Sequence, residues 1–432
     1  MLLKNGLDYI FMSIINTKDD IARRVKFIVY IETAECYDLK ILMVSTEFPP
    51  MHGGVGRYCK KLVDSLRSEG VDVFVACNEN GKGDYVGISP NNKNNTEVLL
   101  KIVKEVEPDV VHVQYEHGLY GIHLHPIKPR KTHTNIESFY NECKVPIVTT
   151  FHSAYTFTQW MRLVVPLNNR LFGRPGTLLR MVYDYWTHLI NYNSFNSLNR
   201  QKIGLNKAGV VFSKYLAKLI PGTTLIYHGA EPSCSPPLER NDARKAFSLP
   251  EGENLALAVG FMTATKGWDI IRKMKVPKGW KIVINTSRNH YGREKLNDNF
   301  ENEGVINLNR GFLSDRDLSL LLYSVDALVL PYKVTSGSGV MYDGLAHGLP
   351  FISSKLEFFK EFSDMKLGIM VNRTPAEFSD SLLKLKMNYK VYKDAVVDQR
   401  KQLLWKEVAK KHIFLYNSII DHASPPLLKI NG

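Results

Sequence analysis

Residues 331–354 read PYKVTSGSGVMYDGLAHGLPFISS, and this stretch decides the fold of the chain. The apolar run just before it, at 326–331, has no helical period and predicts a buried parallel strand. The sequence SGSG at 336–339 then predicts a tight loop before a short helix, and residues 351–354 predict the next strand. Unpaired N–H groups and the helix dipole both favour negative charge, so this loop predicts an anion site. An ordinary strand–loop–helix crossover is the alternative, because short glycine motifs are weak signals.

Four residues of this stretch are candidates for contact with such an anion. Ser338, Gly339 and Val340 begin the predicted helix, where backbone N–H groups face the loop. Asp343 follows further along the helix, and its carboxylate can accept hydrogen bonds from the two hydroxyl groups of a ribose. The alternative for Asp343 is a solvated side chain without a ligand.

The composition is that of an ordinary globular protein. The chain has 432 residues, 44% hydrophobic and 23% charged, which is enough for about two to three domains. No apolar run reaches the roughly eighteen residues that indicate a transmembrane helix. The five cysteines lack CxxC spacing, which argues against a disulfide framework and against a structural zinc site. A cytoplasmic protein is the expected setting.

The formal net charge of +13 predicts an anionic partner. Residues 156–207 hold seven basic residues and one acidic residue, together with many aromatic residues. This combination suits an anionic membrane surface or a lipid-phosphate substrate. Single-stranded nucleic acid would also suit it, but no nucleic-acid module is recognised and none is predicted as a partner. The plainer alternative is a set of helices that pack their aromatic residues inward and leave the arginines outside.

A regular alternation of strands and helices begins after residue 38. The first elements expected are a strand at 39–45, a helix at 58–69 that ends before Gly70, and a strand at 71–76. The first strand runs into a loop that contains Gly53, Gly54 and Gly56. Doubly wound sheets bind ligands at such strand ends. The spacing is not GxGxxG, so a nicotinamide cofactor is not indicated.

Two later strands of this half end in polar side chains. These strands are expected at 110–114 and 145–150. Glu116 and His117 follow the first, and His152 follows the second. Because parallel strands end at one edge of a sheet, these side chains are expected to converge on a cleft with the glycine loop. A purely structural role is the alternative for each histidine.

The alternation repeats after a domain boundary near Pro221. Strands are expected at 255–260, 280–284, 305–309 and 327–330, with 351–354 as the last clear strand. Thr265 and Lys266 follow the first of these strands beside a predicted helix N-terminus, where a cation suits a phosphate. Residues 402–420 predict an amphipathic closing helix.

These features resemble the GT-B glycosyltransferases, and their details are similar to the large retaining family four, which includes bacterial mannosyltransferases and sucrose synthases. The matching segments are EFPPMHGGVGR at 47–57, FH at 151–152, GFMTATKG at 260–267, DGLAHGLP at 343–350, and LWKEVA at 404–409 with LY at 415–416. The resemblance covers roughly residues 39–420.

The resemblance implies an α/β fold of GT-B type, in which two doubly wound Rossmann-like domains face a central cleft. It implies an acceptor domain at 39–221, on which the closing segment 402–432 packs, and a nucleotide-sugar donor domain at 222–401. Residues 1–38 form an extension with no assigned role.

The implied activity is that of a retaining, metal-independent hexosyltransferase of glycan biosynthesis. It would move a sugar from a nucleotide diphosphate sugar to a hydroxyl acceptor, with a UDP- or GDP-sugar as co-substrate and no bound cofactor. The acceptor would be an anionic or lipid-linked glycan. The expected location is cytoplasmic, with peripheral attachment to the inner face of an anionic membrane.

The resemblance also assigns roles to the candidate residues. Lys266 would stabilise the leaving diphosphate, and His152 would hydrogen-bond the donor sugar near the reacting carbon. The donor-binding set is Gly53, Gly54, Gly56, Thr265, Ser338, Gly339, Val340 and Asp343. The acceptor-side candidates are Arg57, Glu116 and His117. Asp315-Arg-Asp317 matches a pattern that binds metal in some sugar transferases, but it lies in the first turn of a helix predicted at 314–323, so helix capping is favoured and no metal ligand is predicted.

Two positions depart from the family pattern. Phe261 lies near the place of an arginine that usually precedes the lysine. The first glutamate of a Glu-x7-Glu region, which normally contacts the transferred sugar, falls on Thr335, and the second falls on Asp343. A second hypothesis is therefore a non-catalytic nucleotide-sugar or polyanion-binding protein. A nucleotide-sugar epimerase would need catalytic carboxylates that the sequence does not show.

Overall fold

The computed structural model describes residues 39–168, 177–233, 239–288, 290 and 300–423. The chain divides into a unit of residues 1–39 and a unit of residues 40–432, and the fold of the second unit contains two parallel β-sheets covered by helices. The extension expected at 1–38 and the last residues of the closing segment, 424–432, lie outside the described residues.

The first sheet has seven parallel strands in the order β3-β2-β1-β4-β5-β6-β7. They are β1 (Lys40–Val44), β2 (Asp72–Cys77), β3 (Tyr85–Val86), β4 (Val110–Tyr115), β5 (Ile147–Phe151), β6 (Lys207–Val211) and β7 (Thr223–Leu225). Every residue of β4 and β5 is buried, as expected for strands covered on both faces. Because β7 pairs with β6, this sheet continues past the boundary expected at Pro221 and ends at Leu225.

Helices cover this first sheet and fill the crossovers between its strands. They are α3 (Gly54–Ser68), α4 (Asn95–Val106), α5 (Glu137–Glu142), α6 (Phe157–Asn168), α7 (Thr177–Arg200) and α8 (Lys214–Leu219), with 3₁₀ turns η1 (His117–Tyr120) and η2 (Pro129–Lys131). The helix expected at 58–69 begins earlier, at Gly54, because Gly53 is its extended N-cap and a carboxylate satisfies N–H groups of its first turn. Gly70 follows this helix at a positive φ of 86°, as expected for a terminating glycine.

The second sheet has six parallel strands in the order β10-β9-β8-β11-β12-β13. They are β8 (Asn254–Phe261), β9 (Trp280–Ser287), β10 (Val305–Asn307), β11 (Ala327–Leu330), β12 (Phe351–Ser354) and β13 (Gly368–Val371). The elements around them are α9 (Arg240–Ala246), η3 (Ala264–Lys266), α10 (Trp268–Lys273), α11 (Asp315–Tyr323), α12 (Gly339–Ala346), α13 (Glu357–Asp364), α14 (Pro375–Met387) and α15 (Tyr389–Gln399). Strand β13 was not predicted from the sequence.

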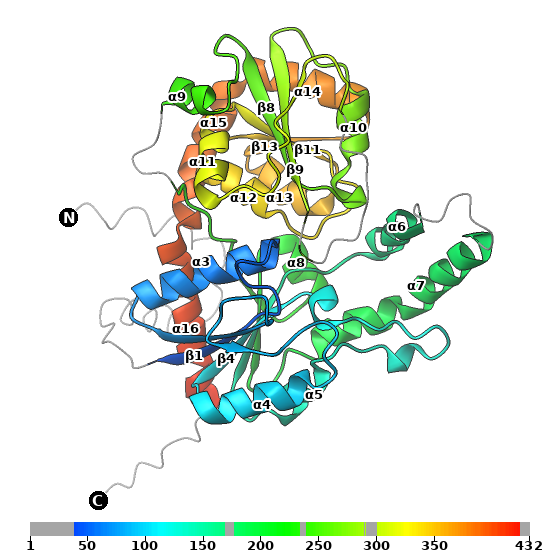
Figure 1. Ribbon diagram of the computed structural model, residues 1–432, viewed down its shortest axis with the longest axis vertical. Helices are drawn as coiled ribbons and strands as arrows, with labels where there is room; N and C mark the ends of the chain where they lie inside the picture. The colour runs from blue at the N-terminus through cyan, green and yellow to red at the C-terminus, as the bar shows by residue number, and fades with distance from the viewer. Residues whose placement is uncertain (1–38, 169–176, 234–238, 289, 291–299, 424–432) are drawn as a thin grey trace, which may run out of the picture. The chain divides into compact units, whose positions relative to one another are not determined.

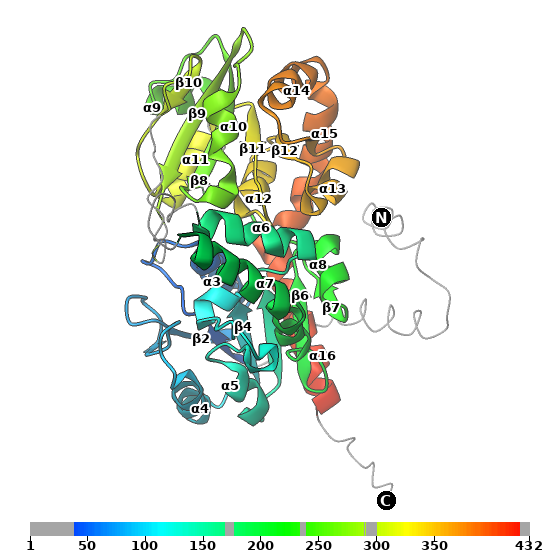
Figure 2. The same cartoon turned by 90° about the vertical axis from the view of Figure 1, so that its right-hand side faces the viewer.

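The closing helix α16 (Trp405–Ala423) follows the turn η4 (Arg400–Leu403) and packs against α3. Figures 1 and 2 show α16 running alongside the first sheet. Its Tyr416 hydroxyl lies 2.6 Å from Nδ1 of His112 on β4, which ties the end of the chain to the first sheet. The helix begins three residues later than the expected start at 402, since 402 lies in η4.

Cys59, Cys77 and Cys143, the cysteines within the described residues, are free thiols. Among the described helices, none combines the length and apolar character needed to cross a membrane.

Candidate active site

A cleft lies between the strand ends of the two sheets and receives residues from both halves of the unit. Eight of the candidate residues line it: Gly53, Gly54, Arg57, Lys266, Ser338, Gly339, Val340 and Asp343. The strand–loop–helix unit of residues 327–346 forms as expected, with β11 before the loop and α12 after it. This unit and the N-terminus of α3 both line the cleft.

One corner of the cleft joins Lys266 to the start of α12. The Lys266 Nζ lies 3.9 Å from the centre of the Tyr332 ring, and the Tyr332 hydroxyl lies 3.2 Å from Ser338 Oγ. Ser338 caps α12, and its Oγ accepts a hydrogen bond from the Met341 N–H at 3.2 Å. Helix geometry leaves the N–H groups of Gly339 and Val340 without an acceptor inside the helix. A cation and two backbone donors therefore face the same corner, an arrangement that suits an anionic group.

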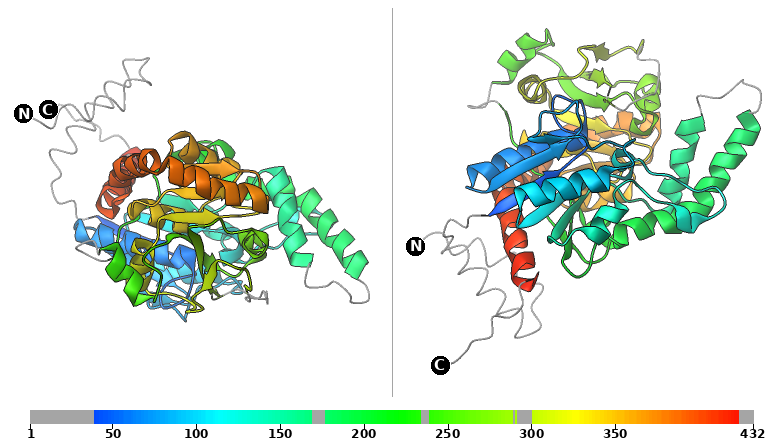
Figure 3. Two further views of the ribbon diagram at one scale, coloured as in Figure 1. Left: turned by 90° about the horizontal axis from the view of Figure 1, so that it is seen from above. Right: turned by 60° about the horizontal axis from the view of Figure 1, so that its bottom comes forward.

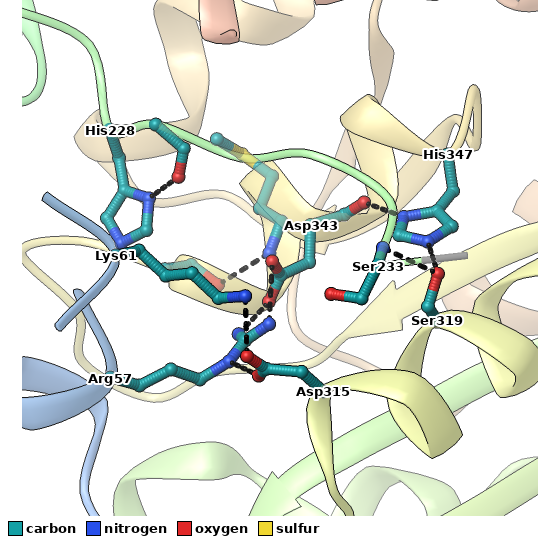
Figure 4. A network of polar contacts seen from close by, with 11 residues as sticks. Arg57, Lys61, His228, Ser233, Asp315, Ser319, Asp343 and His347 are labelled. Carbon is teal, nitrogen blue, oxygen red and sulfur yellow. Dashed lines mark hydrogen bonds and ion pairs between the residues drawn. The ribbon is translucent and has the colours of Figure 1, made fainter. Parts of the chain in front are cut away.

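Asp343 forms the centre of a charge cluster between the two halves (Figure 4). Its Oδ2 lies 2.5 Å from Arg57 Nη1, and its Oδ1 lies 3.3 Å from Nη2 of the same side chain. Asp315 accepts from Arg57 Nε at 2.7 Å and pairs with Lys61 Nζ at 2.7 Å. Burial lowers the pKa of Arg57, but the two carboxylates outweigh burial and raise it. Arg57, expected on the acceptor side, thus holds the carboxylate expected to bind the donor ribose.

Asp315 makes ion pairs that the interpretation of the DxD pattern as helix capping did not predict. The acid lies in the first turn of α11, as expected, and Ser314 caps this helix by accepting from the Asp317 N–H. Its carboxylate also pairs across the cleft with Arg57 and Lys61, and these cations lower its pKa although burial raises it. No local signal could reveal a partner 258 residues away.

A chain of hydrogen bonds holds the backbone of Asp343. The Nδ1 of His347 lies 2.6 Å from the Asp343 carbonyl, so Nδ1 must donate and Nε2 must accept. Ser319 Oγ lies 2.6 Å from that Nε2 and itself accepts from the Ser233 N–H at 3.1 Å. Figure 4 shows this chain on the side of α12 away from Arg57.

The N-terminal glycine loop is organised by a carboxylate of the protein itself. Glu47 Oε2 accepts from the N–H groups of Val55 and Gly56, each at 3.0 Å. A Cβ on Gly53 would come within 1.7 Å of this carboxylate, whereas one on Gly54 would meet nothing within 4 Å. Only the Gly53–Gly54 edge of the loop lines the cleft, and Gly56 lies behind it against the Glu47 backbone.

His152 lies beside the cleft without lining it. Its Nε2 donates to Gln114 Oε1 at 2.9 Å, and its ring packs 5.3 Å from the Tyr58 ring and 5.1 Å from the Phe212 ring. Burial lowers the pKa of His152 to about 3, so its imidazole is neutral at physiological pH. Its backbone carbonyl accepts from Ser336 Oγ at 3.2 Å, which connects the end of β5 to the loop before α12.

The other candidates outside the cleft lining have structural partners. Glu116 caps η1 by accepting from the Leu119 N–H and also accepts from Ser153 Oγ. His117 is buried, and its ring stacks 3.9 Å from the Phe195 ring. Thr265 lies in η3, where its carbonyl accepts from the Lys333 N–H at 2.8 Å. Glu116 and His117 therefore both have contacts inside the N-terminal half.

His228 is a cleft residue to which the sequence pattern assigned no role. It follows β7, lines the cleft, and stacks 5.2 Å from the Tyr342 ring of α12. Its Nδ1 donates to the Gly229 carbonyl at 2.7 Å, so the bare Nε2 faces the Gly339 side of the cleft. Burial lowers its pKa to about 4, which leaves a neutral hydrogen-bond acceptor there. Trp405 lines the cleft beside it.

The described residues contain no group of three or more histidine, cysteine, aspartate or glutamate side chains arranged to hold a metal ion.

Residues 52–191 match the model of the family described as Glycosyltransferase Family 4. This region covers the start of α3 through most of α7. No curated protein sequence matches the chain significantly.

Solved structures of glycosyltransferases share the whole arrangement at low sequence identity. Sucrose-phosphate synthase from Thermosynechococcus elongatus is 14% identical, with a TM-score of 0.60 over 89% of this chain and 99% of that one. The HepE protein of Anabaena in complex with UDP-glucose is 14% identical, with a TM-score of 0.55 over 89% and 98%. The catalytic domain of starch synthase IV from Arabidopsis thaliana, bound to ADP and acarbose, is 13% identical, with a TM-score of 0.55 over 89% and 100%.

The two parallel sheets of this chain and its likeness to these structures confirm the expected α/β fold. The family match and the structural neighbours support a glycosyltransferase enzyme. The chain has the GT-B fold.

Proposed function

We propose that the chain transfers a sugar from a nucleotide diphosphate sugar to a hydroxyl acceptor, with retention at the anomeric carbon and without a metal ion. The observation that supports it most is the corner where Lys266, Tyr332 and Ser338 bring a cation to the N-terminus of α12. Negative charge grows on the diphosphate as it leaves, and donors fixed in advance stabilise it without reorganising. The structures of HepE with UDP-glucose and of starch synthase IV with ADP are consistent with such a donor.

Each donor-side residue has a specific task in this proposal. Lys266 and the N–H groups of Gly339 and Val340 bind the diphosphate, while the exposed edge at Gly53 and Gly54 lets it approach the backbone closely. Asp343 accepts a ribose hydroxyl, and its remaining lone pairs allow it to keep Arg57.

The sugar-side residues are neutral, which suits contact with hydroxyl groups. His152 is proposed to hydrogen-bond the donor sugar near the reacting carbon, and its low pKa excludes it as a proton donor at neutral pH. Same-face attack by the acceptor hydroxyl gives retention without a carboxylate nucleophile. Motion between the two halves would exclude water and limit hydrolysis.

The acceptor is proposed to bind in the N-terminal half and to carry negative charge, as a lipid-linked or otherwise anionic glycan. The excess of basic residues at 156–207 supports this choice. Together with this acceptor we propose a cytoplasmic location, with peripheral attachment to the inner face of the membrane.

The test is binding and slow hydrolysis of UDP-, GDP- and ADP-sugars, followed by thermal shift and by detection of the released nucleotide, with and without EDTA. We expect one nucleotide sugar to stabilise the chain in both conditions. Lys266→Ala should weaken this binding and should slow hydrolysis by about 100- to 1000-fold, as for loss of one donor to a developing anion. Lys273→Ala removes an exposed lysine of α10 and should change neither.

A second candidate, a non-catalytic nucleotide-sugar or polyanion-binding protein, is favoured by Thr335. Its hydroxyl bonds to the Gly337 backbone inside the loop, so this position provides no carboxylate for the sugar. Binding of a nucleotide sugar without turnover, in the presence of membrane extract as an acceptor source, would support this candidate over the transferase.

An EDTA-sensitive reaction, or an inverted anomer by NMR, would contradict the metal-independent retaining mechanism.

A further inference from the structure

Helix α7 presents an apolar face to solvent. The residues of this face, called the α7 apolar face below, are Leu178, Leu179, Val182, Tyr183, Tyr185, Trp186 and Leu189, and each is exposed. At about 100° per residue they fall within one arc of roughly 160° around the helix. Soluble helices normally direct such an arc toward the core, so this one is inverted.

The charged residues of this part of α7 lie outside the arc and pair with each other. Arg180 and Asp184 are i,i+4 neighbours on the opposite side, with 3.1 Å between Nε and Oδ1. The α7 apolar face itself contains no charged residue. Its exposed area is therefore continuous and uncharged.

Specific hydrogen bonds fix the other side of α7 inward, so the exposure is built into the fold. Asn191 is fully buried, accepts from Thr132 Oγ1, and donates to the His125 carbonyl at 2.9 Å. Trp160 on α6 donates through Nε1 to the His188 carbonyl at 2.8 Å. The hydrogen bonds of Asn191 and of the His188 carbonyl hold the helix in this rotation.

The positive charge of the surrounding sequence indicates which partner binds the α7 apolar face. Residues 156–207 contain seven basic residues and one acidic residue, of which the buried Lys202 is paired with Glu137 and does not add to the surface charge. Two copies of the chain brought together here would repel each other, whereas anionic lipid would attract the same charge. Tyrosine and tryptophan have an apolar body and a polar tip, which suits the boundary between headgroups and acyl chains.

We propose that the α7 apolar face docks on an anionic lipid bilayer, with Trp186 and the leucines entering the boundary of the acyl region. Helix α6 packs beside α7 and also contacts η3, the turn that contains Lys266. Figure 3 shows α6 and α7 side by side at one edge of the molecule. Docking through α7 therefore brings the cleft within reach of a bilayer-anchored molecule, but the docking does not depend on any sugar transfer.

Trp186 provides a direct optical test. It is 54% exposed, whereas the other four tryptophans of the chain are at most 9% exposed. On mixing with vesicles of phosphatidylcholine and phosphatidylglycerol, its emission should shift to the blue and be quenched by brominated acyl chains. Trp186→Phe should remove the quenching and leave co-sedimentation nearly intact.

The matched binding test uses two exposed leucines and a distant control. Leu178→Ser with Leu179→Ser should lower co-sedimentation with anionic vesicles at least tenfold. Met387→Ser, on α14 and similarly exposed, should leave it unchanged. Circular dichroism of the double variant should match the parent, because both leucines are about three-quarters exposed (74% and 77%).

Three outcomes would overturn the proposal. The first is absence of vesicle binding. The second is equal binding to pure phosphatidylcholine, which would remove the charge argument. The third is a dimer in analytical ultracentrifugation that the double variant dissociates, since a second copy would then cover the face.

Discussion

Two adjacent glycines, Gly53 and Gly54, are needed for different reasons. Gly53 has an extended backbone that any residue can adopt, with φ near −164°, so only its missing Cβ matters. A methyl group there would collide with the Glu47 carboxylate that satisfies the first turn of α3. We expect Gly53→Ala to lower the free energy of unfolding by about 1–3 kcal/mol, as overpacking does. Urea denaturation measures it.

Gly54→Ala is the matched control for this prediction, since its Cβ would meet nothing. Alanine also favours helix over glycine, so stability should stay equal or rise by up to about 1 kcal/mol. Equal destabilisation by both substitutions would show that the Glu47 cap is not what requires Gly53.

Arg57 joins the two carboxylates of the charge cluster in the cleft, those of Asp315 and Asp343. Its side chain is partly exposed, but Asp343 is buried, so removing the cation leaves a buried carboxylate unpaired. Arg57→Ala should therefore lower the free energy of unfolding by about 1–3 kcal/mol, the cost of a buried acceptor left without its donor. Thermal denaturation of the variant and the parent measures this cost.

Asp315→Asn separates the two ion pairs of Arg57. Asp315 is more exposed than Asp343, and exposed pairs contribute little, so the cost should be below about 1 kcal/mol. A larger cost for Asp315→Asn than for Arg57→Ala would contradict the central position of Asp343.

Helix α12 is the element whose N-terminus the fold places at the candidate site. Ser338 caps it at the cleft, as Thr374 caps α14 elsewhere by accepting from the Glu377 N–H at 3.3 Å. Alanine at either position should cost about 0.5–2 kcal/mol. Only Ser338→Ala should also weaken nucleotide-sugar binding, because its hydroxyl fixes the first turn whose N–H groups face the ligand. Isothermal titration of both variants decides this.

The helices and strands also differ in how well the sequence predicts them. Strands β1, β4, β5 and β11 were predicted from short apolar runs, because burial on both faces requires such runs. The early start of α3 at Gly54 was missed, because the cap comes from Glu47, which precedes the helix and reaches it only through the turn between them. Strand β13 was missed because its Gly-Ile-Met-Val run gains strand geometry only by pairing with β12.

At the scale of the whole molecule, buried histidines predict sensitivity to acid. Burial lowers the pKa of His152 to about 3 and those of His228 and His412 to about 4. In the unfolded chain a histidine titrates near 6.5, so the unfolded state takes up protons first as the pH falls. The stability should therefore be complete above about pH 6.5 and should fall progressively toward pH 4.

The variant that tests this origin is His412→Leu, since His412 lies in the contact of α16 with the first sheet. It should reduce the dependence of unfolding free energy on pH between 6.5 and 4 by up to about 1.4 kcal/mol per pH unit. His133→Gln, an exposed histidine, should leave the slope unchanged. The raised pKa values of buried Glu47 and Glu116 act in the opposite direction, so the comparison of slopes is the decisive measurement.

Periodicity, glycine positions and strand burial act over a few residues, so the sequence predicted most local elements, the two glycine-rich strand ends and the cation at position 266. The folded structure was needed to show that Arg57 holds Asp343, 286 residues away, and that Asp315 is an ion-pair partner as well as a first-turn acid. It also shows that His152 lies beside the cleft and that Tyr183, Tyr185 and Trp186 of α7 face outward. Ion pairs and the exposure of a helix face depend on packing between segments that are distant in the sequence. Neither the spacing of residues nor the composition of the chain contains that information.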